Sequence, residues 1–113
     1  MDTQKHLSYE RRRDRRVFLK LKLQYQHARR VCYTLTNDIS AGGVKIMSDY
    51  FLPISTILTL QLSLDQAQEI VQATGEVVWI EKLPYSERYK IGVKFKEIGE
   101  RSSYSIHGFV ANI

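Results

Sequence analysis

The most regular feature of the sequence is an alternation of apolar and polar residues with a period of two. Between positions 17 and 25 every odd position is apolar and the even positions are polar, with Phe18 as the exception. Since successive side chains of a strand point to opposite faces, this period indicates a strand with one buried face. A first strand over residues 17–25 is therefore predicted.

The same alternation recurs further along the chain. Its apolar positions are Val31, Tyr33 and Leu35, then Leu58, Leu60, Leu62 and Leu64, then Ile91, Val93 and Phe95. Each set is expected to form one face of a sheet. Two more strands are predicted at 43–47 and 69–81, and Trp79, within the second of them, is interpreted as a core residue.

Turn signals separate these segments. Glycine or proline occurs at 41–43, 52–53 and 83–84. About six short strands with such connections are typical of an antiparallel sandwich or barrel, and a barrel leaves no exposed sheet edge. The alternation ends near residue 100.

The last segment, 100–113, is predicted to form a short helix. Tyr104, Phe109 and Val110 are spaced near one and two helical turns, so they are expected to share one face. Gly108 disfavours this helix by about 1 kcal/mol relative to alanine. The predicted fold class is thus mainly β with a C-terminal helix.

Composition favours a single cytoplasmic domain. The 113 residues, 43% of them hydrophobic, suffice for one core, which we place at 10–113 after a flexible segment 1–9. The N-terminus has no apolar run typical of a signal peptide, and no segment is long and apolar enough for a membrane span. The single cysteine, Cys32, excludes an internal disulfide and a cysteine-rich zinc site. The histidines are scattered, without the spacing of metal ligands, and the sequence contains none of the common catalytic motifs. Neither a metal site nor an enzyme is therefore predicted.

Positive charge is concentrated near the N-terminus. Residues 10–30 contain nine Lys or Arg and two acidic residues, a net +7, so the remainder of the +5 chain is −2. A local positive field implies an anionic partner such as a nucleotide, a nucleic acid or an acidic lipid. Composition does not distinguish among them.

Within this region, five of the six positions 11–16 are arginine. A solvated basic tail is the simpler interpretation. Arginine, however, has a planar fork of donors that binds a phosphate or the O6/N7 edge of guanine in bidentate fashion. The absence of lysine from these positions favours recognition over solubility.

A second candidate segment, 37–43, lies between two predicted strands. Its residues suit a tight turn, through side-chain-to-backbone bonds and a glycine at positive φ. Alternatively, Asp38 can accept a hydrogen bond from guanine, and Ser40 adds a donor and acceptor on the same side of an extended chain. Gly43 would then allow close approach of a ligand.

Together, in this order, the two segments resemble the PilZ family of cyclic di-GMP receptors. The family pattern, Arg-x-x-x-Arg before the first strand and then Asp-x-Ser-x-x-Gly, falls on Arg12 and Arg16 and on Asp38, Ser40 and Gly43. Arg11 and Arg15 are the alternative register. Segments 75–80 and 89–95 are similar to later strands of the family. The resemblance implies a six-stranded antiparallel barrel followed by a helix, with the arginine segment folding over one barrel opening onto the ligand.

The resemblance also implies the roles of these residues in bacterial second-messenger signalling. Arg12 and Arg16 would bind phosphate and the Hoogsteen edge of guanine, while Asp38 and Ser40 would bind its other edge. An arginine directly before the motif, here Arg11, resembles the pattern of family members that bind two cyclic di-GMP molecules per site, so the resemblance implies two molecules here as well. No other cofactor is implied. On binding, the arginine segment would become ordered and present a new surface to an effector protein.

Two rival functions remain open at this stage. A small basic barrel could bind single-stranded nucleic acid, with Tyr25, Tyr33 and Tyr89 as stacking platforms. A structural module could instead dock its arginine segment on an acidic partner. The clustering of charge before the first strand argues against the nucleic-acid barrel.

Overall fold

The computed structural model of the 113-residue chain describes residues 15–64 and 69–112. The proposed ligand residues Arg11 and Arg12 and the segment 1–9 lie outside these residues.

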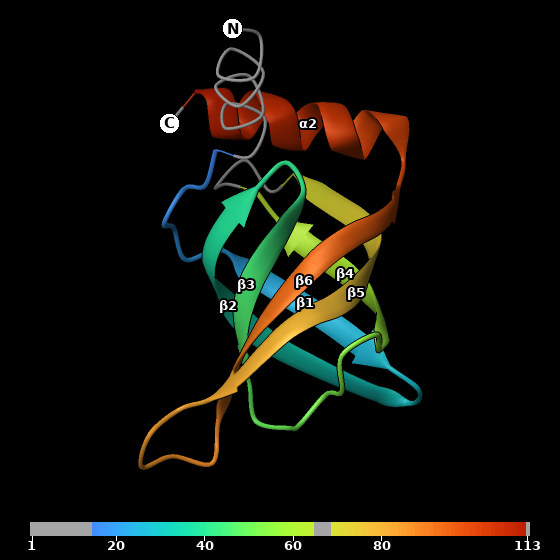
Figure 1. Ribbon diagram of the computed structural model, residues 1–113. Coiled ribbons are helices and arrows are strands. Elements are labelled where there is room, and N and C mark those ends of the chain that lie inside the picture. Colours follow the sequence, from blue (N-terminus) through green and yellow to red (C-terminus); the bar gives the residue numbers. More distant parts are fainter. Residues whose placement is uncertain (1–14, 65–68, 113) are drawn as a thin grey trace, which may run out of the picture.

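Six antiparallel strands form a closed barrel in the order β1-β2-β3-β6-β5-β4, and β1 pairs with β4 to close it (Figure 1). The strands are β1 (Lys22–His27), β2 (Arg30–Ser40), β3 (Gly43–Ser48), β4 (Ile57–Ser63), β5 (Ile70–Lys82) and β6 (Tyr89–Ile98). This arrangement confirms the predicted fold class.

Most of the predicted apolar faces point into the barrel. On β4 the leucines at 58, 60 and 62 are at most 2% exposed, and Ile91 and Val93 of β6 are at most 3% exposed. Burial of side chains of this size is worth about 1.5 to 3 kcal/mol each. The period of two therefore located the core correctly on these strands.

The first predicted strand is shorter than expected. Regular pairing begins only at Lys22, and Val17 forms an isolated bridge with Ile39. Between them, the Thr36 hydroxyl accepts a hydrogen bond from Leu21 N and donates one to Leu19 O. Thr36 N still donates to Leu21 O at 2.9 Å, but the Thr36 side chain takes the place of the other ladder bonds, which the alternation of 17–25 does not reveal.

The predicted apolar face of β2 is on the outside of the barrel. Val31, Tyr33 and Leu35 are 42%, 77% and 45% exposed. The alternation is real, but its inward positions are Cys32 and Thr34, which are partly buried. The three residues share one face of the sheet, as predicted, but this face is exposed to solvent.

The helix α2 (Glu100–Ala111) lies across one end of the barrel (Figure 1). Its buried residues are Ile106 and Val110, with Phe109 packed against the core. Tyr104 is 76% exposed, so its predicted place on the buried face is wrong. Ile106 occupies that face instead.

The loops divide between the two ends of the barrel. The tight turn 41–42 between β2 and β3 lies at the end covered by α2, whereas the connections 28–29, 49–56 and 83–88 lie at the opposite end (Figure 1). We call these the helix end and the loop end. An eleven-residue β2 at about 3.3 Å per residue separates them by about 30 Å.

Candidate functional site

The bridge at Val17 brings the arginine segment against β2. Val17 N donates to Ile39 O at 2.8 Å, and Ile39 N donates to Val17 O at 2.9 Å. Arg16, directly before this bridge, is thereby positioned beside the end of β2 that carries Asp38 and Ser40. Sequence-distant parts of the proposed motif therefore meet at the helix end.

Arg16 and Asp38 form an ion pair. Arg16 Nη1 donates to Asp38 Oδ1 at 2.5 Å. The Asp38 side chain is only 4% exposed, while that of Arg16 is 38% exposed. A buried carboxylate needs such a partner, because an unpaired buried charge is strongly destabilising. The pair holds the guanidinium in place and leaves part of it open to solvent.

Arg15 faces a different part of the molecule. Its Nη1 donates to Val110 O of α2 at 3.4 Å. Of the two arginines at positions 11–16 that the structure describes, Arg16 is therefore the one that meets Asp38. This geometry favours the register with Arg16 over the alternative with Arg15, although Arg12 and Arg11 lie outside the described residues.

Ser40 is built into the turn that follows it. Its hydroxyl accepts from Gly42 N at 3.2 Å and donates to Gly43 O at 3.4 Å, and the residue is 1% exposed. The side-chain-to-backbone bonds expected of a simple turn are therefore present. The glycine at positive φ is not, since all six glycines lie in the described ranges and none has a positive φ.

Gly43 is required by the barrel itself. A Cβ at this position would lie 2.1 Å from the carbonyl oxygen of Val93 on the neighbouring strand β6. No side chain fits there without moving the backbone. The close approach is thus between two strands, and it accounts for the glycine independently of any ligand.

A row of side chains crosses the outer wall of the barrel beside Asp38. Asp38 pairs with Lys45 on β3, Lys45 pairs with Gly92 on β6, and Gly92 pairs with Trp79 on β5. Cross-strand partners share a face, so these residues lie side by side on the outside. The Lys45 Nζ is 5.2 Å from the centre of the Trp79 ring.

Trp79 is not a core residue, contrary to the sequence interpretation. It is 38% exposed, because β5 shifts register between Val77 and Trp79. Val77 is fully buried, and the extra residue Val78 turns the following side chain outward. An indole ring beside a lysine offers a surface on which a planar base can stack.

The register of β2 also shifts between Thr36 and Asp38. Thr36 points inward, and Asn37 is the extra residue that turns Asp38 to the outer wall. Asn37 Oδ1 is buried and has no hydrogen-bond partner among the described residues. Neither Asn37 nor Lys45 was singled out from the sequence, because a polar residue in a strand reveals neither a bulge nor its cross-strand neighbours.

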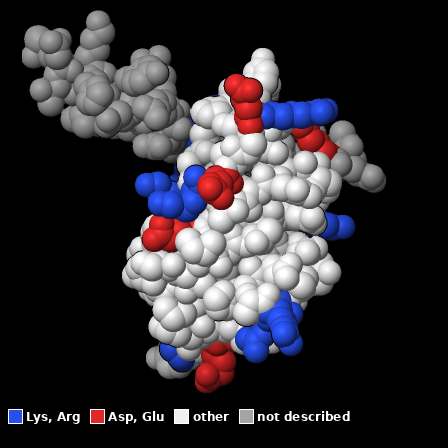
Figure 2. Space-filling model, turned by 90° about the vertical axis from the view of Figure 1, so that its right-hand side faces the viewer, with Lys and Arg blue, Asp and Glu red and all other residues white. Residues whose placement is uncertain are grey.

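The described residues do not favour the nucleic-acid barrel. Of its three tyrosine platforms, Tyr25 is 3% exposed and faces the core, whereas Tyr33 is exposed. On the face shown in Figure 2, Lys and Arg side chains lie in separate groups with wide uncharged areas between them. Residues 15–64 and 69–112 contain neither a group of three metal-binding side chains nor a helix that could span a membrane.

Comparison with solved structures finds the same fold within two larger proteins. Over 86% of its length the chain matches the Bacillus subtilis inhibitor of motility MotI/DgrA, with a TM-score of 0.77 and 22% identity. It matches apo MrkH of K. pneumonia over 83%, with a TM-score of 0.72 and 18% identity. The chain covers only 48% and 46% of those proteins, about half of each.

A further match is a PilZ domain of similar length. The PilZ domain of Escherichia coli YcgR, solved with cyclic di-GMP, has a TM-score of 0.69 at 13% identity, and each chain covers 90% of the other. No curated protein sequence matches the chain significantly. The sequence profile of the PilZ domain, however, matches residues 10–112. The chain therefore belongs to the PilZ domain family.

Proposed function

We propose that this chain is a cyclic di-GMP receptor that binds the nucleotide on the outer wall of the barrel at the helix end. The observation that carries the proposal is the contact between Arg16 and Asp38, which brings together both halves of the family pattern. A PilZ domain of the same fold, that of YcgR, was solved with this ligand. PilZ domains are in general ligand-binding modules and not enzymes.

The residues around the contact supply the three kinds of group that the ligand needs. Arg16 provides a guanidinium for phosphate or the Hoogsteen edge of guanine, and Asp38 accepts from guanine N–H groups. Trp79 provides a stacking surface. The side-chain amide oxygen of Asn37, Oδ1, is a buried acceptor without a hydrogen-bond partner among the described residues. Each charged hydrogen bond is worth about 1.5 to 3 kcal/mol, so a few account for micromolar affinity.

Arg11 and Arg12 complete the site in this proposal. Arg12 binds the phosphates together with Arg16, and Arg11 stacks on a guanine, which gives two nucleotides per site. Ligand phosphates neutralise the mutual repulsion of the five arginines at 11–16, so binding orders the segment. The ordered segment then forms the surface that an effector protein recognises.

Isothermal titration of the purified chain with cyclic di-GMP tests this function. We expect a dissociation constant of about 1 µM or tighter with two nucleotides bound per chain, and no binding of GTP at the same concentrations. A stoichiometry of one would refute the paired-ligand part alone. Binding of a short single-stranded DNA without binding of the cyclic dinucleotide would instead support the nucleic-acid barrel.

The stacking role of Trp79 is tested by a matched pair of variants. Trp79→Ala is expected to weaken cyclic di-GMP binding by about tenfold, since stacking on an aromatic ring is worth about 1 to 3 kcal/mol per base. Val78→Ala, at the adjacent exposed position, is expected to leave affinity unchanged. Equal affinities for both variants would remove Trp79 from the site.

A further inference from the structure

The loop end of the barrel contains a cavity that the proposed nucleotide site does not use. Its volume is about 530 Å³, and it lies between the β1–β2 hairpin and the segment that follows β3. Residues that line it include His27, Arg29, Arg30, Cys32, Tyr50 and Leu52. The length of β2 separates this cavity from Ser40 by about 30 Å.

Arg30 is held in a fixed orientation at the wall of this cavity. Its guanidinium carbon lies 3.8 Å from the centre of the Tyr50 ring. A guanidinium stacked through its face still has its N–H donors at the edge of its plane. Within residues 15–64 and 69–112, no carboxylate pairs with Arg29 or Arg30.

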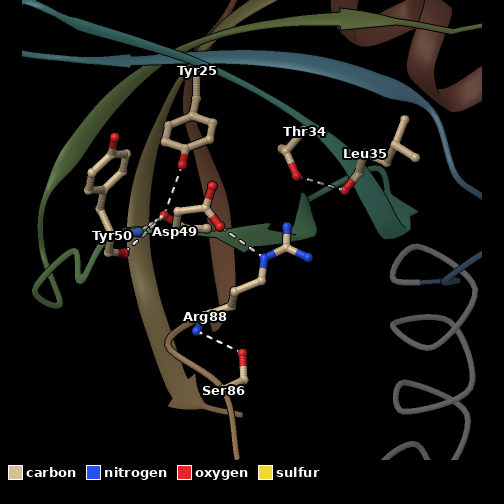
Figure 3. Close-up of polar contacts among 8 residues, drawn as sticks. Tyr25, Thr34, Leu35, Asp49, Tyr50, Ser86 and Arg88 are labelled. Atoms are coloured by element: carbon tan, nitrogen blue, oxygen red, sulfur yellow. Dashed lines mark hydrogen bonds and ion pairs between the residues drawn. The ribbon is translucent and has the colours of Figure 1, made fainter.

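A chain of hydrogen bonds fixes the tyrosine under Arg30. The Ser48 hydroxyl accepts from Tyr50 N at 3.0 Å and donates to Tyr50 O at 2.9 Å. Tyr25 in turn bonds this hydroxyl at 2.8 Å (Figure 3). These bonds fix the backbone of Tyr50 against the buried wall of the barrel. Arg30 stacks on the ring of this residue and is therefore positioned by it.

The turn that carries Arg29 is also tightly defined. His27 pairs with Arg30, which leaves Ala28 and Arg29 as a two-residue turn, and Ala28 has a φ of 55°. A left-handed alanine is disfavoured by about 1 kcal/mol or more. The hairpin thus holds two neighbouring arginines at the rim of one cavity.

The cavity has no compensating negative charge among its lining residues. The nearby Asp49 is paired with Arg88, whose Nε donates to Asp49 Oδ1 at 2.9 Å (Figure 3). Burial raises the pKa of Tyr25 to about 12, so its phenol is neutral at physiological pH. Figure 2 shows both Lys or Arg and Asp or Glu side chains at this end of the barrel, and the acidic ones are not among the residues that line the cavity.

We propose that this cavity is a second ligand site, which binds a phosphoryl group between Arg29 and Arg30. Two guanidinium forks match the oxygens of a phosphate dianion, and His27 lies beside them. The cavity is large enough for an organic group beyond the phosphate, which Tyr50 and Leu52 would contact. A soluble phosphate ester and an anionic lipid headgroup offer the same chemistry.

Cys32 provides a built-in probe, because it lines the cavity and is the only cysteine of the chain. The rate at which it reacts with a neutral dithiodipyridine reagent is measured with increasing pyrophosphate, a sugar phosphate or phosphatidylglycerol vesicles. We expect saturable slowing by pyrophosphate and by one of the other two probes. Protection by the sugar phosphate identifies a soluble ligand, and protection by vesicles identifies a lipid.

The double variant Arg29→Gln/Arg30→Gln is expected to weaken this protection by about 100-fold in probe concentration. In Arg30→Lys, which keeps the charge but loses the fork of donors, protection of Cys32 should be weaker than in the unaltered chain and stronger than in the double variant. Arg101→Gln removes a cation from α2, at the other end of the barrel, and is the matched control. All three variants should bind cyclic di-GMP as the unaltered chain does, which separates this site from the proposed receptor site.

The proposal is wrong if none of the three probes slows the reaction of Cys32. It is equally wrong if slowing persists undiminished in the double variant, or if Arg101→Gln reduces it as much. Should the double variant fail to fold, Arg30→Lys decides alone, because protection equal to that of the unaltered chain would show that the fork has no role.

Discussion

The two halves of β2 differ in sequence pattern and in how far they are buried. From Arg30 to Leu35 the side chains of Val31, Tyr33 and Leu35 point to solvent, whereas from Thr36 to Ser40 every residue except Asn37 is almost fully buried. The bulge at Asn37 separates the halves and reverses which positions face the core.

The difference shows that burial on the outer wall of the barrel depends on what covers the strand. Asp38 and Ser40 point to the outer wall, yet they are 3% and 1% exposed, because the chain around Arg16 and Val17 and the tight turn lie against them. Tyr33 has no such cover. The covered half contains the proposed nucleotide site, and the uncovered half leads to the cavity at the loop end.

The largest effect on this comparison is expected at the tip of the covered half. Gly43→Ala would place a Cβ 2.1 Å from the Val93 carbonyl oxygen, so we expect a loss of about 3 kcal/mol in the free energy of unfolding. Gly42→Ala is the control, since its Cβ would lie 3.9 Å from the nearest atom, the Ser40 hydroxyl oxygen. Urea denaturation of both variants measures the difference, and equal stabilities would contradict the packing argument.

The next effect concerns the buried carboxylate. Asp38→Ala removes the acceptor proposed for guanine and the partner of Arg16, so cyclic di-GMP affinity should fall by about 100-fold. Asp49→Ala, which breaks the exposed pair with Arg88, should leave this affinity unchanged. Titration calorimetry compares the two, and a similar loss in both variants would argue against a specific role of Asp38.

A pH dependence is expected from Tyr25, which pairs with Cys32 of the uncovered half. Burial raises its pKa from 10.0 to about 12 in the folded chain. The neutral phenol is thus favoured by folding. The contribution of the neutral phenol to folding stability is complete below pH 10 and is lost as the pH rises toward 12, so that on the order of 1 kcal/mol is gone by pH 11.

Tyr25→Phe cannot ionise at this position, so it isolates the effect from the other titrating groups. The stability gap between the unaltered chain and Tyr25→Phe should shift in favour of the variant between pH 9 and pH 11. Denaturation curves at the two pH values measure this shift. A gap that stays constant would show that the phenol is not the titrating group.

The smallest effect is expected on the uncovered half. Tyr33→Ser alters a side chain that is 77% exposed, so the free energy of unfolding should change by no more than about 0.5 kcal/mol. Leu60→Ala, on the inner wall, should cost about 2 to 5 kcal/mol by comparison. A large loss for Tyr33→Ser would mean that this face is covered in the native protein.

The sequence by itself determined the elements and the core of most strands. The period of two at 58–64 and 91–95 located β4 and β6, and the turn residues at 41–43 and 83–84 located two hairpins. These features are local, because side-chain alternation and turn chemistry depend on neighbouring residues. The family pattern at Asp38 and Ser40 was equally visible as a string of residue types.

Only the tertiary structure decided which side of a strand faces the core and which residues meet. Two bulges, at Asn37 and Val78, turn Asp38 and Trp79 to the same outer wall. No local sequence pattern predicted these bulges. β1 is shorter than predicted because the Thr36 hydroxyl takes the place of ladder bonds, and the local sequence does not reveal this contact either. The meeting of Arg16 with Asp38, of Lys45 with Trp79 and of Arg30 with Tyr50 depends on strand register, which closure of the barrel fixes across the whole chain.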